Sequence, residues 1–199
     1  MIYLNDIYQK DTGSEEVDKQ FHTKYAILGL LTIGCQTGYS MKKMMDGSLN
    51  HFWKISYGQI YPTLKSLLEE ELITVQEESE SGKPDKKKYE LTSLGWQALY
   101  NWTETPIEEL GVEKNELLLK LFFSHHQSNE TTLKQLDHYK LKLLERLNTY
   151  QAIDEMIRGT YGDQEDAKFW LLTLDYGIRT TEAASEWADE AIKKLTLRR

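Results

Sequence analysis

Hydrophobic residues recur at helical spacing between Ser56 and Glu71. The apolar positions fall on one face of an α-helix, and they are Ile60, Leu64, Leu67 and Leu68. Ser56 followed by Gln59 has the form of a capping box, which indicates that the helix begins at Ser56. The sequence therefore predicts a helix with one face in a core, whereas the opposite face near its start carries small and hydrogen-bonding side chains.

The chain before this helix predicts two shorter helices and a polar extension. The apolar run YAILGLLTIG, from Tyr25 to Gly34, is typical of a buried helix that ends at a glycine. The stretch GYSMKKMMDGSL follows a turn at residues 36–38 and predicts a second helix that ends near Gly47. Residues 1–23 are polar and rich in charge, so we expect a flexible amino-terminal extension there.

After Glu71 the hydrophobic pattern changes from the period of a helix to that of strands. A short strand-like run follows Glu71, and a second run alternates from Lys88 to Thr92. The turn between them, residues 77–88, is rich in glycine, proline and charge. The order helix, helix, helix, hairpin is that of a winged helix-turn-helix, and we predict a mainly α fold with a small β-hairpin wing over residues 24–104.

The rest of the chain, residues 105–199, predicts an α-helical domain. A helix from Thr92 to Glu104 leads into it, and three further helices are expected over residues 115–124, 131–158 and 163–195. In the last helix, apolar and small residues recur at alternating steps of four and three, which is the spacing of a coiled-coil seam: Trp170, Leu174, Gly177, Thr181, Ala184, Ala188, Ala191 and Leu195. Such a seam packs against another helix, which is either the preceding helix of the same chain or the same helix of a second copy.

Composition and charge narrow the class of protein. Of the 199 residues, 40% are hydrophobic and 28% are charged, as in ordinary globular domains. The net charge is −8, and residues 104–199 contain 13 basic and 18 acidic residues, so a protein whose whole surface is basic is excluded. No run is long enough to span a membrane, the start does not resemble a signal peptide, and Cys35 is the single cysteine. We therefore expect a cytoplasmic protein that has no membrane partner.

No sequence pattern points to catalysis, a metal or a cofactor. His125 and His126 are adjacent, so on a helix they point about 100° apart and cannot form the i, i+4 ligand pair of a zinc helix. The chain contains no glycine-rich phosphate loop, no G-x-S-x-G and no paired-cysteine motif. We predict that the protein is not an enzyme and binds neither a metal nor a cofactor.

Several separated motifs resemble one known family. In order, between Lys24 and Trp102, they are KYAILGLL, TGYSMKK, HFWKISYGQIYPTLKSLLEEELI, and GKP followed by KKYELTSLGWQAL. Together they closely resemble the amino-terminal domain of the PadR family of bacterial transcriptional regulators. The resemblance implies a winged helix-turn-helix and a homodimer that binds double-stranded DNA. It also implies repression, usually relieved by a small molecule or a stress signal, and two related recognition helices predict a palindromic operator.

A DNA-binding role assigns side chains to particular contacts. Side chains near the amino end of a helix in the major groove reach base edges, and the candidates are Ser56, Tyr57, Gln59 and Thr63. Gln59 can pair with adenine through both amide atoms, unless the capping box occupies it. Lysines and tyrosines on flanking elements and in the hairpin are candidates for contacts with the DNA backbone: Tyr25, Lys42, Lys43, Lys54, Tyr61, Lys65, Lys83, Lys86 and Lys87.

Two further interactions and one alternative function stay open. The resemblance favours a second copy as the partner of the carboxy-terminal seam, because the carboxy-terminal helices of longer PadR-like proteins form the dimer. It also implies an effector, and a small planar hydrophobic compound would meet aromatic side chains, which equally suit a core: Trp96, Tyr100, Trp102, Phe122 and Phe123. The alternative is a winged-helix protein-interaction module without DNA binding, whose apolar interface would respond little to salt.

Overall fold

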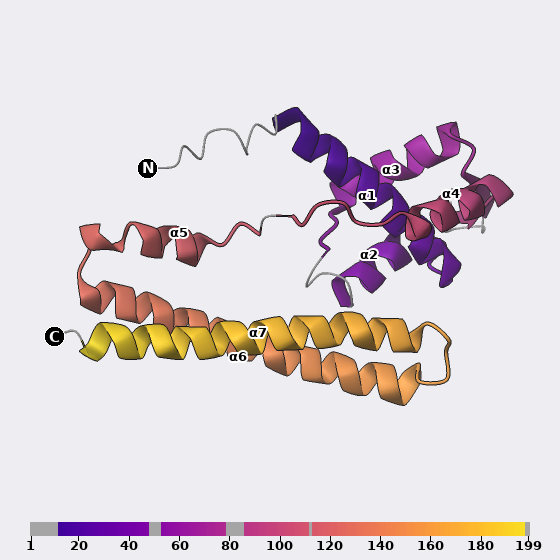
Figure 1. Ribbon diagram of the computed structural model, residues 1–199. Helices are drawn as coiled ribbons and strands as arrows, with labels where there is room; N and C mark the ends of the chain where they lie inside the picture. Colours follow the sequence, from indigo (N-terminus) through magenta and orange to yellow (C-terminus); the bar gives the residue numbers. More distant parts are fainter. Residues whose placement is uncertain (1–11, 48–52, 79–85, 112, 198–199) are drawn as a thin grey trace. The chain divides into compact units, whose positions relative to one another are not determined.

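The chain forms two compact units, Met1–Glu108 and Glu109–Arg199. The computed structural model describes residues 12–47, 53–78, 86–111 and 113–197, and Figure 1 follows the elements along the chain. The domain boundary predicted at residue 104 lies close to the division between the two units, which follows Glu108.

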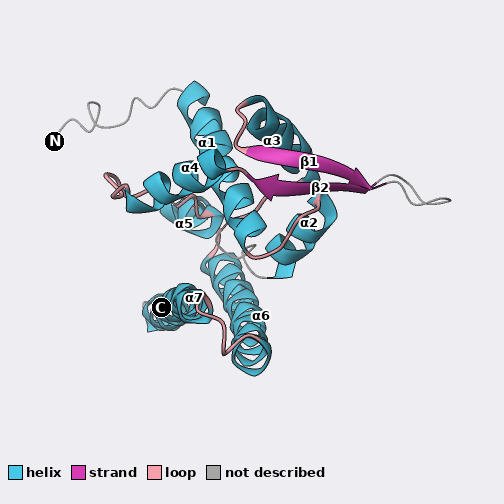
Figure 2. Cartoon of the chain, turned by 90° about the vertical axis from the view of Figure 1, so that its right-hand side faces the viewer, coloured by secondary structure: helices cyan, strands magenta, loops and turns pink. Residues whose placement is uncertain are grey.

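The amino-terminal unit has the element order of a winged helix-turn-helix. Its elements are α1 (Thr12–Thr32), α2 (Gly38–Gly47), α3 (Tyr57–Glu69), β1 (Ile73–Glu78), β2 (Lys86–Leu91) and α4 (Ser93–Glu104). The two strands are antiparallel, with Ile73 opposite Leu91 and Glu78 opposite Lys86. Figure 2 shows this hairpin beside α1 and α3. The predicted fold class, a mainly α winged helix-turn-helix followed by a helical region, is confirmed.

The core of this unit is built on the apolar stripe of α3. Ile60, Leu64 and Leu67 are buried, and they pack with buried residues of α1 and α2 such as Leu28 and Met41. Burying a leucine or isoleucine side chain in this way contributes about 1.5–3 kcal/mol to folding. The predicted face of the helix is therefore the face that holds α3 to the rest of the unit.

The corner between α3 and the wing is tied to the start of α4. Glu71 follows α3 in the left-handed region, at φ 57°, which turns the chain into β1. The Thr92 hydroxyl donates to the Glu71 carbonyl at 2.8 Å, and the Thr92 N–H donates to the Leu72 carbonyl at 3.1 Å. At Gly95 the two backbones lie so close that an added Cβ would be 2.0 Å from the Leu72 carbonyl oxygen. This contact fixes the wing relative to α3 and α4.

The first helix is longer than the sequence analysis predicts. α1 begins at Thr12 rather than near Tyr25, so residues 12–23, which we expected to belong to a flexible extension, are helical. The physical reason is that adding a residue to an existing helix costs less free energy than nucleating a new helix. The helical turn held in the core by the buried residues Ile27 and Leu28 is such a nucleus, and the helix extends from it toward Thr12. Residues 1–11 lie outside the described part of the chain.

The carboxy-terminal unit is a long helical hairpin preceded by a short helix. Its elements are α5 (Glu116–Phe122), a 3-10 helix (Ser124–His126), α6 (Asn129–Thr160) and α7 (Ala167–Leu197). Figure 1 shows α6 and α7 running side by side. A cluster of buried residues near the turn of the hairpin includes Tyr150, Ile153, Ile157, Ala167 and Leu174. No helix in the described ranges is long and apolar enough to cross a membrane.

The predicted seam of α7 packs inside this hairpin. Leu174, Thr181 and Ala188 are buried, and Trp170 packs against the buried cluster. At Gly177 an added Cβ would lie 3.0 Å from the Tyr150 ring, so glycine allows this tyrosine of α6 to approach α7 closely. The buried part of the seam, Leu174, Thr181 and Ala188, is covered by α6 of the same chain. The other five seam residues are partly buried, and a dimer contact through them stays a prediction: Trp170, Gly177, Ala184, Ala191 and Leu195.

Candidate nucleic-acid interface

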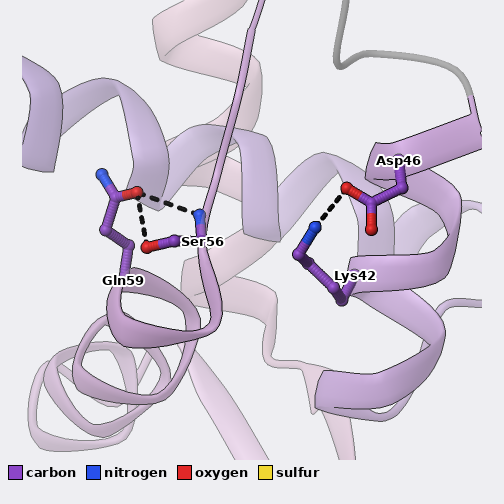
Figure 3. A network of polar contacts seen from close by, with 4 residues as sticks. All are labelled: Lys42, Asp46, Ser56 and Gln59. Carbon is purple, nitrogen blue, oxygen red and sulfur yellow. Dashed lines mark hydrogen bonds and ion pairs between the residues drawn. The ribbon is translucent and has the colours of Figure 1, made fainter.

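The start of α3 is held by a hydrogen-bonded cap. Ser56 is the N-cap residue, and its backbone N–H and its hydroxyl both donate to Gln59 Oε1, at 3.0 and 3.1 Å. Figure 3 shows the Gln59 side chain turned toward Ser56, with its amide nitrogen pointing away. The glutamine oxygen is therefore occupied within the protein, whereas its Nε2 hydrogens remain as donors.

Two tyrosines form a pair on the exposed side of α3. Tyr57 and Tyr61 lie one turn apart, and their rings are stacked with centroids 6.4 Å apart and planes at 15°. Their exposed fractions are 45% and 54%, which is large for side chains of this size. The pair is not predicted above, although the i, i+4 spacing of Tyr57 and Tyr61 is a signal for it in the sequence.

Helix α2 contacts this tyrosine pair at two positions that are also one turn apart. The Lys42 ammonium lies over the Tyr57 ring, 5.8 Å from its centroid. A Cβ added to Gly38 would lie 3.0 Å from Tyr61 Cε1, so the Tyr61 ring fills the space beside this glycine. Lys42 also forms an ion pair with Asp46, which Figure 3 shows.

Thr63 does not belong to the exposed face of α3. Its exposed fraction is 4%, and its hydroxyl donates to the Gln59 carbonyl at 2.7 Å. The expectation that Thr63 contacts bases is therefore corrected: its side chain lies on the core side, between the buried residues Ile60 and Leu67. The signal was present in the sequence, because Thr63 occupies the i+3 position of the stripe that begins at Ile60.

The lysines proposed for the DNA backbone differ in their surroundings. Lys43 and Lys54 are exposed, and no ion pair is recorded for either of them within the described ranges. Lys65 is exposed and lies 3.7 Å from Glu69, in an i, i+4 pair. Such exposed pairs are worth only a few tenths of a kcal/mol, roughly 0.3–0.5, so Lys65 can leave Glu69 for a phosphate at little cost.

The wing carries a lysine that already has an acidic partner. Lys87 Nζ lies 3.0 Å from Glu77 Oε1, on the strand opposite. Tyr89, two residues later, is buried, and its N–H donates to the Gln36 carbonyl at 2.8 Å, which anchors the wing to the turn before α2. Burial raises the pKa of the Tyr89 phenol, and the nearby Lys87 opposes this shift. Lys83 and the side chain of Lys86 lie outside the described part of the chain.

Tyr25 belongs to an aromatic cluster between helices. Its ring is stacked on Trp102 of α4, with centroids 4.8 Å apart and planes at 5°. His22 lies edge-on to Trp53 and Trp102, and Phe21 lies edge-on to Tyr25. The ring of Tyr25 therefore packs α1 against α4, and its contact with the DNA backbone stays a prediction.

The aromatic residues considered for an effector do not form one group. Trp102 is part of the aromatic cluster, while Trp96 and Tyr100 are exposed on the same helix, α4. Phe122 and Phe123 lie in the other unit, edge-on to each other and exposed. A cavity of about 550 Å³ lies between α5 and α6, and none of these five residues lines it.

The single cysteine, Cys35, is buried. Burial raises the pKa of the Cys35 thiol, which disfavours the reactive thiolate. Among the described residues, no group of three or more His, Cys, Asp or Glu side chains could hold a metal ion. The exposed face of α2 and α3 presents hydrogen-bond donors, aromatic rings and lysines.

Comparison with known proteins identifies the family. Residues 27–101 match the model of the transcriptional regulator PadR-like family, and residues 113–196 match the virulence activator alpha carboxy-terminal family. The negative transcriptional regulator PadR of Bacillus subtilis is 35% identical over 136 residues, which cover 65% of this chain and 74% of the relative. The chain belongs to the PadR family of transcriptional regulators.

The PadR-family fold is also found in solved structures. The crystal structure of B. subtilis PadR in complex with operator DNA has a TM-score of 0.77 and 27% identity, and the match covers 87% of this chain and 99% of that one. The structure of the same protein in complex with p-coumaric acid has a TM-score of 0.72 and 26% identity, covering 94% and 98%. PadR-family proteins are transcriptional regulators and not enzymes, as the sequence analysis predicts for this chain.

Proposed function

We propose that this PadR-family chain is a homodimeric repressor that binds duplex DNA through α2 and the start of α3. The observation that carries the proposal is the separation between the two faces of α3. Leu64 and Leu67 are held in the core, whereas Ser56 and Tyr57 are exposed at the amino end. A helix held in this way can enter a major groove without loss of core packing. The match to B. subtilis PadR bound to operator DNA supports this use of the fold.

Gln59 is proposed to contact bases as a hydrogen-bond donor only. Because its Oε1 accepts from Ser56, pairing with adenine through both amide atoms would break the cap. The free Nε2 can instead donate to acceptors in the major groove, such as purine N7, guanine O6 or thymine O4. Ser56 and Tyr57, at the exposed amino end of the helix, are the other proposed base contacts.

Lys43 and Lys54 are proposed to contact phosphates. They lie on α2 and directly before α3, on the elements that flank the proposed reading helix, and both are exposed. Each lysine that neutralises a phosphate releases counterions, so binding should weaken steeply as salt rises. This dependence also separates DNA binding from the alternative of an apolar protein-interaction module.

The test is a binding assay on the DNA upstream of the chain's own gene, with an unrelated duplex of equal length beside it. We expect Lys43→Ala and Lys54→Ala each to weaken binding to both duplexes and to lower the salt slope by about 1. Gln59→Ala should reduce the preference for the upstream DNA by about 1–3 kcal/mol. Lys193→Ala, which alters an exposed lysine of α7 that pairs with Glu190, is the matched control and should bind like wild type.

The result that contradicts the proposal is equally specific. Wild-type protein that binds neither duplex, or that binds with no salt dependence, would remove the proposed DNA-binding function. Because Gln59 also caps α3, thermal unfolding of Gln59→Ala is measured in parallel, and a loss of DNA preference counts only if the variant remains folded at the assay temperature.

The homodimer is proposed to form through the outer side of the helical hairpin, because the seam is covered by α6. Phe169, Leu172 and Tyr176 of α7 are spaced by three and four, so they share one face, and Leu172 is 66% exposed. Phe122 of α5 is 83% exposed. Exposed apolar side chains that share one helix face, as the three of α7 do, are typical of surfaces that another protein covers. A second copy of the chain offers the same surface and satisfies the two-fold symmetry of a palindromic site.

Substitutions on this outer face test the dimer. We expect Leu172→Asp to shift the protein from dimer to monomer in analytical ultracentrifugation at micromolar concentration, because an unpaired carboxylate would be buried in the interface. Lys193→Asp, on the exposed side near the end of α7, is the control and should leave the dimer intact. A wild-type protein that sediments as a monomer throughout this range would rule out the proposed assembly.

A planar aromatic effector is the proposed signal for release from DNA. The support is the match to B. subtilis PadR in complex with p-coumaric acid, together with the exposed rings of Trp96 and Tyr100 on α4. Titrating p-coumaric acid into the protein–DNA complex, with tryptophan fluorescence as a second readout, tests the proposal for that compound. An unchanged DNA affinity at saturating compound would exclude it, and Trp96→Phe should change the fluorescence response if Trp96 lies at the site.

A further inference from the structure

Helix α2 packs beside α3 so that it contacts both tyrosines of the Tyr57 and Tyr61 pair. Gly38 and Lys42 lie one turn apart on α2, and they contact Tyr61 and Tyr57, respectively. Tyr57 and Tyr61 are in turn one turn apart on α3 and stacked on each other. The position of the two rings is therefore set by α2 as well as by α3.

Gly38 is the closest of these contacts. A Cβ at this position would lie 3.0 Å from Tyr61 Cε1 and 3.1 Å from both Cζ and the hydroxyl oxygen. These distances are shorter than ordinary van der Waals contact, which lies near 3.5–4.0 Å. Any side chain at residue 38 would push the outer half of the Tyr61 ring away from α2.

Backbone conformation does not explain why residue 38 is a glycine. Gly34 has φ 85°, in the left-handed region that favours glycine, whereas no positive φ is found at Gly38. Within a helix, alanine is favoured over glycine by its intrinsic propensity. The space taken by the Tyr61 ring is the remaining structural reason for glycine at this position.

The geometry points to Gly38 as a positioning residue for DNA binding. We propose that Gly38 admits the Tyr61 ring against α2, and that this places the Tyr61 hydroxyl where it donates a hydrogen bond to a DNA phosphate. Tyr61 is 54% exposed despite this contact, so a large part of its side chain is accessible to a partner. The inference rests on the proposed DNA-binding function of the α2 and α3 face.

A small displacement is enough to remove such a contact. A hydrogen bond between hydroxyl and phosphate oxygens needs a separation of about 2.5–3.0 Å and near-linear geometry. A methyl group at residue 38 would force the ring to move by a few tenths of an ångström or to rotate, and Tyr57 stacked beside it would move as well. Gly38→Ala should therefore weaken DNA binding without touching DNA itself.

The experiment is a double-mutant cycle in the full-length protein, read out as affinity for the duplex upstream of its own gene. We expect Tyr61→Phe, Tyr61→Ala and Gly38→Ala each to lower affinity about tenfold, as for loss of one hydrogen bond to a charged group. In Tyr61→Ala there is no ring for a side chain at residue 38 to displace. Adding Gly38→Ala to Tyr61→Ala should therefore have no further effect on DNA affinity. Gly29→Ala, at a helical glycine with open space around it, is the matched control and should bind like wild type.

The possible outcomes separate this inference from the function on which it rests. If the wild type binds DNA but Gly38→Ala lowers affinity equally in the presence and absence of the Tyr61 ring, Gly38 acts on the fold alone and the inference is wrong. Full affinity of Gly38→Ala would also overturn it. If Gly38→Ala fails to fold, Tyr61→Ala should restore folding in the double variant, and failure to do so contradicts the proposed contact. A wild type that does not bind refutes the DNA-binding function instead.

Discussion

The proposed DNA face of the amino-terminal unit and the proposed dimer face of the carboxy-terminal unit expose different kinds of side chain. On the amino-terminal unit the proposed DNA face presents tyrosines and lysines, such as Tyr57, Tyr61 and Lys43. On the carboxy-terminal unit the hairpin and α5 present large apolar groups, such as Phe122 and Leu172. Lysine and tyrosine suit a hydrated, negatively charged partner, whereas exposed leucine and phenylalanine suit a surface that excludes water. The difference agrees with the different partners proposed for the two surfaces.

The two units also differ in how their functional surfaces are supported. The exposed face of α3 is rigidly held from behind, because its opposite face is in the core and Ser56 caps its start. In the hairpin, α6 and α7 cover each other along a single seam, α5 packs against α6, and the outer face of α7 leaves Phe169, Leu172 and Tyr176 exposed. We expect the first surface to be formed in the single chain and the second to become stable only when another molecule covers it.

The largest effect should come from the joint that holds the wing to α3. Gly95→Ala places a Cβ 2.0 Å from the Leu72 carbonyl oxygen, and backbone on both sides of this contact cannot move away easily. We expect a loss of about 3 kcal/mol or more in the free energy of unfolding of the amino-terminal unit, measured by urea denaturation. Gly29→Ala is the control, and a Gly95→Ala variant as stable as the control would show that the joint is looser than described.

The next largest effect on stability is expected on α7, where the seam and the outer face should respond differently to truncation. Leu174 is 8% exposed and Leu172 is 66% exposed, although both lie on the same helix. Leu174→Ala should lower the free energy of unfolding by about 2–4 kcal/mol, because it leaves a cavity between α6 and α7. This loss should be the same at every protein concentration.

Leu172→Ala should behave differently from Leu174→Ala in the same thermal scans. If Leu172 contacts a second copy, its truncation destabilises only the associated form, so the drop in melting temperature should depend on protein concentration. A drop in melting temperature that is independent of concentration for both variants would place Leu172 in the fold of the single chain. The comparison between the two faces of α7 would then no longer hold.

The smallest effect concerns two positions that share a backbone conformation. Glu71 has φ 57° and Gly34 has φ 85°, both in the left-handed region. Glu71→Gly should relieve the strain of a β-carbon there and stabilise the protein by about 1 kcal/mol, while Gly34→Ala should destabilise it by a similar amount. Since an added Cβ at Gly34 meets no atom within 4 Å, its effect reports the backbone alone. Equal melting temperatures for both variants and wild type would contradict this reading.

Much of the fold could be predicted from local sequence, because periodicity reports which face of an element is buried. The stripe at Ile60, Leu64 and Leu67 and the switch to strands after Glu71 both appear in the structure. Periodicity does not report what covers a face. The seam at Leu174 and Ala188 was correctly read as a packing surface, but whether α6 or a second copy covers it depends on the hairpin.

The candidate site was predictable only in part, for a related reason. Gln59 and Tyr57 could be proposed as base contacts because they lie near a recognisable helix start, and the structure places them at the start of α3. Thr63 was misplaced because its polar character was given more weight than its position in the apolar stripe. The contacts of Tyr25 with Trp102 and of Gly38 with Tyr61 join residues far apart in the chain, and no local pattern encodes such pairs.

The cap at Gln59 has a consequence for how binding preference can evolve in this chain. Its Oε1 keeps α3 in register while its Nε2 is left over as a donor. Glutamate at this position would retain one oxygen for the cap and replace the donor by a second acceptor, which suits cytosine N4 or adenine N6 instead of guanine O6. Glutamine and glutamate codons differ at a single nucleotide. With the base contact proposed for Gln59, a new operator preference is one point mutation away, and the helix start that presents it would be preserved.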